Sequence, residues 1–148
     1  MGRRPSQISF IERVRDGDRK VRYLDVVIDG SRLTDLYEVA ERDMVSCFDY
    51  ANIEASTESV LALTLDEISA DFGSMLPYVC PLCADIGCGA VQIMVSRTQH
   101  DFSWSRFAYV NGFDDPIPLP IGPFKFEMRA YLSAVRGIPE RLTASPSS

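Results

Sequence analysis

The sequence contains a single histidine, His100, and no apolar run that approaches the ~18 residues needed to span a membrane. One imidazole excludes sites that need two, such as those of the HExxH zinc hydrolases. The GxGxxG, P-loop and GxSxG patterns are also missing. No apolar stretch follows the basic first residues, so we expect no secretory signal, no membrane segment and a cytoplasmic protein. These absences favour a protein that is not an enzyme.

The composition is that of an ordinary globular domain. Of the 148 residues, 46% are hydrophobic and 24% are charged, which excludes a disordered or collagen-like chain. The length suits one domain of average size. We expect this domain to cover residues 1–142 and to be followed by a disordered tail over 143–148.

Charge is distributed unevenly along the chain. The net charge is −6, yet residues 1–22 carry seven Lys/Arg against three Asp/Glu, whereas residues 23–91 carry two against thirteen. The acidic middle segment repels phosphate and attracts cationic partners over a Debye length, ~8 Å at physiological salt. Direct nucleic-acid binding is therefore disfavoured. The alternative interpretation is an acidic surface that only maintains solubility.

The beginning of the chain has the pattern of a β-hairpin. Apolar alternation predicts strands over 8–15 and 19–28, joined by a turn at Asp16-Gly17-Asp18. In the second strand the alternation changes phase between Tyr23 and Leu24. This change indicates either a bulge or a strand that is buried on both faces.

A second hairpin is predicted in the C-terminal half. Alternating residues begin a strand at about residue 90, and a second strand over 102–110 changes phase near Arg106. The aromatic residues on this hairpin favour packing in the core over base stacking, because few Lys or Arg lie near them. Four prolines between 116 and 123 then predict a stiff, extended connection.

Helical spacing occurs in three further segments. Ser31 is placed to cap a short helix whose apolar stripe is Leu33, Leu36, Tyr37 and Ala40. Residues 56–72 read as one helix, or as two short helices that meet at Thr64. The last helix is expected over 126–136, with Gly137 as its C-cap and Pro139 as its stop. Together these patterns predict an α+β fold with antiparallel hairpins over 8–28 and 90–110, packed with two to four helices in a single domain.

The cysteines form the one local cluster with chemical content. Cys80 and Cys83 have the Cys-x2-Cys spacing of zinc knuckles and of glutaredoxin dithiols, and Cys88 follows five residues later. A structural zinc takes four ligands, so a zinc site on these three cysteines needs Cys47 or His100 as its fourth. A redox dithiol needs a helix after its first cysteine, and the glycines that follow oppose one. The interpretation we favour is reduced, buried cysteine without a cofactor.

The run YVCPLCADIGCGAV, followed by FSWSRFAYVNGFD and GPFKFEMRAYLSAV, resembles an uncharacterised family of small bacterial proteins. The resemblance covers roughly residues 78–135 and the strand around Asp25, with the helix after it. The family has no established activity, and an oxidoreductase label sometimes attached to it rests on the Cys-x2-Cys motif. The resemblance supports the α+β interpretation and implies little about function.

The charge pattern leads to the main functional hypothesis. A compact acidic protein suits the capture of a basic protein, because complementary fields raise the association rate and select the partner. We therefore expect a non-enzymatic inhibitor of the immunity-protein type, which binds a basic toxin domain of the nuclease class. The alternative is a zinc-binding or thiol-redox protein centred on Cys80, Cys83 and Cys88. The carboxylates expected to bind the partner are Asp35, Glu38, Glu41, Asp43, Asp49, Glu54 and Glu58.

Overall fold

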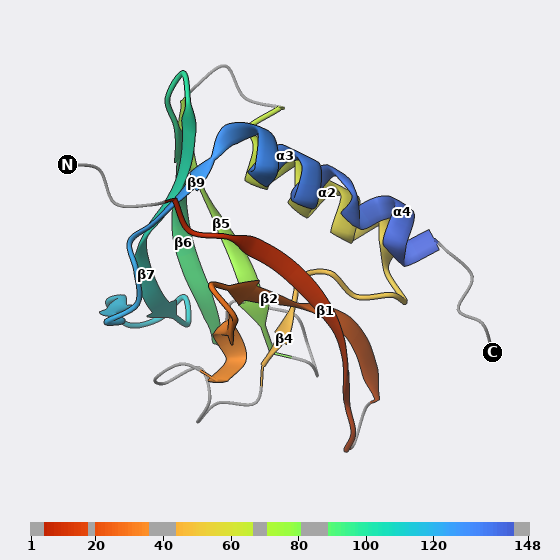
Figure 1. Ribbon diagram of the computed structural model, residues 1–148. Helices are drawn as coiled ribbons and strands as arrows, with labels where there is room; N and C mark the ends of the chain where they lie inside the picture. Colours follow the sequence, from red (N-terminus) through yellow and green to blue (C-terminus); the bar gives the residue numbers. More distant parts are fainter. Residues whose placement is uncertain (1–4, 18–19, 36–43, 67–70, 81–88, 144–148) are drawn as a thin grey trace.

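The structure, a computed structural model, describes residues 5–17, 20–35, 44–66, 71–80 and 89–143 (Figure 1). Within these residues the chain forms a three-stranded and a six-stranded antiparallel sheet. Helices α2 and α3 lie side by side along one side of the sheets (Figure 1). The predicted α+β class is confirmed.

The small sheet has the order β1-β2-β3 and contains the first predicted hairpin. β1 (Ile8–Arg15) pairs with β2 (Val21–Ile28) in one unbroken register, and β3 (Ser31–Arg32) pairs with the end of β2. The unbroken register excludes a bulge in β2. Three successive β2 residues, 24 to 26, are fully buried, so the phase change marks a strand buried on both faces.

The large sheet has the order β4-β5-β6-β7-β8, and β9 also pairs with β7. Its hairpin of β6 and β7 is the second predicted hairpin, and the phase change near Arg106 is a bulge at which this residue takes a φ of +54°. The prolines do not exclude pairing altogether, because Pro118 lies in the short edge strand β8. The strands are β4 (Val45–Ser46), β5 (Phe72–Val79), β6 (Ala90–Arg97), β7 (Asp101–Val110), β8 (Ile117–Pro118) and β9 (Phe124–Glu127).

The helix predicted over 56–72 is confirmed up to Thr64, the residue at which the alternative placed a break, and does not continue through the described residues beyond it. α2 (Ile53–Thr64) is capped by the Asn52 side chain and ends where Leu65 takes a left-handed conformation with φ of +58°. Residues 67–70 lie outside the described residues, and Phe72 already belongs to β5. The prediction failed beyond Thr64 because the apolar spacing continued across the point where α2 ends.

The C-terminal helix is confirmed, with two corrections. α3 (Met128–Arg136) begins two residues after Phe126, which lies in β9 and pairs with Phe102 of β7. Pro139 does not end the helical region, because α4 (Ile138–Thr143) follows directly, with this proline in its first turn, where no backbone N–H donor is needed. Thr143, predicted to begin the tail, is thus the last residue of α4. Residues 144–148 lie outside the described part of the chain.

The predicted helix after Ser31 is described only in part. Ser31 lies in β3, and a single 3-10 turn, η1 (Leu33–Asp35), follows it. The other residues of its stripe, Leu36, Tyr37 and Ala40, fall outside the described residues.

Aromatic side chains join the large sheet to the helices. Trp104 of β7 is fully buried, and its Nε1 donates to the Tyr131 hydroxyl of α3 at 3.0 Å. That hydroxyl in turn donates to the Leu63 carbonyl of α2 at 2.7 Å. Phe102 stacks on the Tyr131 ring with centroids 4.4 Å apart. The prediction that the aromatics of this hairpin pack in the core is confirmed for these residues.

Candidate functional site

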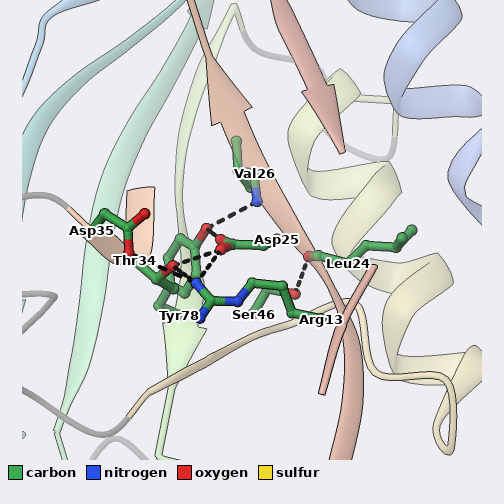
Figure 2. A network of polar contacts seen from close by, with 8 residues as sticks. All are labelled: Arg13, Leu24, Asp25, Val26, Thr34, Asp35, Ser46 and Tyr78. Carbon is green, nitrogen blue, oxygen red and sulfur yellow. Dashed lines mark hydrogen bonds and ion pairs between the residues drawn. The ribbon is translucent and has the colours of Figure 1, made fainter. Parts of the chain in front are cut away.

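A buried carboxylate lies where the two sheets meet (Figure 2). Asp25 of β2 has no exposed surface. One carboxylate oxygen accepts from the Tyr78 hydroxyl of β5 at 2.5 Å, and the other accepts from the Thr34 hydroxyl of η1 at 2.5 Å and from Arg13 at 3.3 Å. The Tyr78 hydroxyl also accepts from the Val26 backbone N–H at 3.0 Å.

This network connects four elements through one charged pair. Burial, followed by the nearby Asp25 charge, raises the pKa of Tyr78 well above its ordinary value, so this hydroxyl stays protonated and donates. Each of the two carboxylate oxygens has a donor, which is what a buried charge requires. The cluster therefore joins the two sheets through side chains of β1, β2, η1 and β5. The sequence signal for it was an aspartate inside the apolar run VRYLDVVI, at the phase change of β2.

A cavity of about 450 Å³ lies among β4, the end of β5 and the start of α2. Its apolar lining includes Val21, Val45 and Val79. Its polar and thiol-bearing lining residues are Ser46, Cys47, Asp49, Asn52, Ser59 and Cys80.

The two described cysteines, Cys47 and Cys80, both line this cavity and neither forms a disulfide. Cys83 and Cys88 fall outside the described residues. His100 lies in the exposed turn after β6, whereas Cys80 follows Val79, which pairs with the first residue of β6. The histidine and Cys80 are therefore at opposite ends of that strand, and Cys47 is the better placed of the two residues considered as a fourth ligand.

The Cys47 thiol is not activated. Burial raises its pKa from 9.0 to about 12, and a hydrogen bond from Ser59 acts in the opposite direction without offsetting the burial. The thiol is therefore protonated near neutral pH and is a poor nucleophile. Among the described residues, no group of three or more His, Cys, Asp and Glu is placed to hold a metal ion.

The predicted partner-binding carboxylates have different environments. Asp35 in η1 is 60% exposed and lies 3.8 Å from Arg13. Asp49 is half-buried, lines the cavity and accepts from the Ala51 backbone N–H at 2.8 Å. Glu54 and Glu58 are exposed on α2. Glu38, Glu41 and Asp43 lie outside the described residues.

Other carboxylates of the acidic segment are paired with arginines from outside it. Besides the Arg13–Asp25 pair, Asp66 lies 3.2 Å from Arg136, and Asp71 lies 3.4 Å from Arg97.

By contrast, Glu54 and Glu58 make no ion pair within the described part of the chain. They are one helical turn apart on α2, which carries no basic residue. Two exposed carboxylates without an ion pair among the described residues therefore lie together in the first two turns of α2, and Asn52, Ala55 and Ser59 of the same segment line the cavity.

Comparison with protein-family models, with curated proteins and with solved structures found no match for this chain. The resemblance of the Cys80 segment to a bacterial family thus stays a prediction. No helix in the described ranges is both long and apolar enough to cross a membrane.

Proposed function

We propose that this protein is a cytoplasmic, non-enzymatic binder of a basic protein, of the type in which an immunity protein neutralises a nuclease toxin. The observation that supports it is the pair of exposed glutamates on α2, Glu54 and Glu58, which lack an ion pair within the described residues. The half-buried Asp49 adds a third carboxylate at the neighbouring cavity.

The physical argument rests on the difference between paired and free carboxylates. A carboxylate that already contacts an arginine, such as Asp66 or Asp71, attracts an external cation weakly because its field is compensated nearby. The α2 glutamates keep their field, which steers a cationic surface toward the helix and the cavity. A nuclease suits this site because the surface that binds phosphate must itself be cationic.

The test measures binding to purified, catalytically inactive nuclease toxin domains, including any that a neighbouring gene encodes. We expect the double variant Glu54→Gln/Glu58→Gln to bind about fivefold more weakly, which corresponds to about 1 kcal/mol for two exposed charge pairs. Glu140→Gln in α4 is the matched control, because it removes an exposed glutamate from another helix. Equal losses in both variants would contradict the assignment to α2, and no binding by the wild type would contradict the function.

A second candidate function is supported by the placement of Cys47 in the same cavity as Cys80. In this alternative, Cys80, Cys83 and Cys88 bind a zinc ion and Cys47 completes the four ligands of a structural site. The raised pKa of Cys47 argues against a redox role for this thiol, because a redox cysteine needs a lowered pKa; a zinc ion bound here would have to displace the thiol proton, since the ligand is the thiolate.

Elemental analysis of the purified protein separates the two candidates. The second candidate predicts one zinc per chain, lost in Cys80→Ser and in Cys47→Ser. A metal-free protein with four titratable thiols would contradict it, and leaves binding of a basic protein as the proposal.

A further inference from the structure

The loop between β7 and β8 exposes an aromatic side chain that the fold does not use. Phe113 is 84% exposed, more than any other large hydrophobic residue in the described ranges. Ile117, at the other end of the loop, is 47% exposed. An apolar side chain in water contributes no burial energy to folding. Aromatic side chains are enriched among the anchor residues of protein–protein interfaces.

The loop holds Phe113 in a defined position. The Asn111 side-chain oxygen accepts from the backbone N–H groups of Phe113 and Asp114, both at 2.9 Å. The Asn111 amide donates to the Asp114 carboxylate at 3.1 Å. The ends of the loop are joined where Tyr109 pairs with Ile117. A ring presented by such a turn loses less conformational entropy on binding than one on a flexible chain.

The stretch of sequence that contains Phe113 carries negative charge only. Asp114 and Asp115 follow Phe113 directly and are exposed, and residues 107–124 contain no Lys, Arg or His. An apolar anchor with an acidic border is complementary to an apolar pocket bordered by Lys and Arg.

The loop lies at the same end of the large sheet as the cavity. Val45, Val79, Ala90 and Val110 form one row of paired residues across four strands, and the loop begins directly after Val110. Three strand spacings separate Val45 at the cavity from Val110, about 14 Å. One interface of standard size, about 800 Å² per partner, is wide enough to include both.

We infer that Phe113 is the apolar anchor by which this protein docks onto its basic partner, inserted into a pocket whose rim of Lys and Arg pairs with Asp114 and Asp115. The inference rests on the proposed function and assigns it a second contact. The α2 carboxylates act mainly on the rate of encounter, and Phe113 acts on the lifetime of the complex.

The test compares Phe113→Ala with Phe72→Ala on the same panel of inactive nuclease toxin domains. Phe72 is a matched control: it is 61% exposed and pairs with Ser96, at the opposite end of the large sheet. We expect Phe113→Ala to weaken binding at least tenfold through faster dissociation, with an unchanged melting temperature and an unchanged salt dependence. Phe72→Ala should bind as the wild type does, and Phe113→Leu should recover part of the loss.

The outcomes separate this inference from the proposed function. Salt-dependent binding by the wild type, with Phe113→Ala indistinguishable from it, would overturn the inference and leave the proposed function standing. Equal losses from Phe113→Ala and Phe72→Ala would overturn it too, because the effect would not be specific to the loop. A wild-type protein that binds none of the basic domains would overturn both.

Discussion

Tyr78→Phe tests whether the buried network holds the two sheets together. The hydroxyl of Tyr78 contacts both Asp25 and the Val26 backbone N–H, and the side chain is only 1% exposed. The substitution keeps the ring and its packing, so any loss of stability reports on the two hydrogen bonds alone.

The expected cost follows from what the missing hydroxyl leaves behind. The N–H of Val26 becomes a buried donor without a partner, which costs about 1–3 kcal/mol. The Asp25 carboxylate loses a charge-assisted hydrogen bond of about 1.5–3 kcal/mol, and keeps Thr34 and Arg13. We therefore expect a loss of about 3–4 kcal/mol in the free energy of unfolding, or roughly 10 °C in melting temperature for a chain of this size.

The assay is equilibrium unfolding in urea, monitored by the fluorescence of the single tryptophan, Trp104. Tyr50→Phe is the control, because its hydroxyl makes a long, exposed bond of 3.4 Å to Glu12, and its loss should cost under about 1 kcal/mol. In both variants the free energy of unfolding should fall with urea at the same slope as in the wild type, and the midpoints of unfolding should differ. A cost for Tyr78→Phe no larger than that of the control would refute the structural role of the network.

Three further predictions concern single positions. Gly89→Ala should destabilise the protein by at least about 2 kcal/mol in urea unfolding, because φ is +97° and a Cβ would overlap the Tyr109 hydroxyl; Gly30→Ala, with open space around it, should cost less. Arg106→Gly should raise the free energy of unfolding by about 1 kcal/mol, because this exposed bulge residue has a φ of +54°; an unchanged or lower value would show that the side chain stabilises the bulge. Burial raises the pKa of the Cys47 thiol from 9.0 to about 12 in the folded protein. The contribution of this thiol to the free energy of unfolding is therefore complete below pH 9, and it falls by about 1.4 kcal/mol per pH unit above pH 9. Urea unfolding at pH 8, 9 and 10 should show this decline in the wild type and not in Cys47→Ser, and parallel curves would contradict the burial of the thiol.

Both hairpins were predictable from sequence because their strands alternate and their turns contain residues typical of turns. β5 was missed because Gly73 and Pro77 interrupt its alternation, and its pairing with β6 is irregular between Met75 and Tyr78. The two short strands β8 and β9 follow from contacts with β7 that are distant in sequence and leave no local pattern.

The candidate site was predictable only as a set of residue types. Counting carboxylates located the acidic segment, but which of them meet an arginine depends on contacts such as that of Asp66 with Arg136, seventy positions away. The burial of Asp25 followed from the fold, although its place in an apolar run was a usable signal. The exposure of Phe113 had no signal in the sequence, because aromatic residues are more often buried.

The most direct test of the central claim, that the free carboxylates of α2 attract a basic partner, is the association rate measured by stopped flow across a range of salt concentrations. We predict that the association rate of the wild type with a basic toxin domain falls steeply as salt rises from roughly 50 to roughly 500 mM. Salt has this effect because it screens exposed charges beyond the Debye length, which is ~8 Å at physiological salt. For Glu54→Gln/Glu58→Gln, the rate should be lower at low salt and converge with that of the wild type at high salt. An association rate that is independent of salt, or equal in the two proteins at low salt, would contradict the claim.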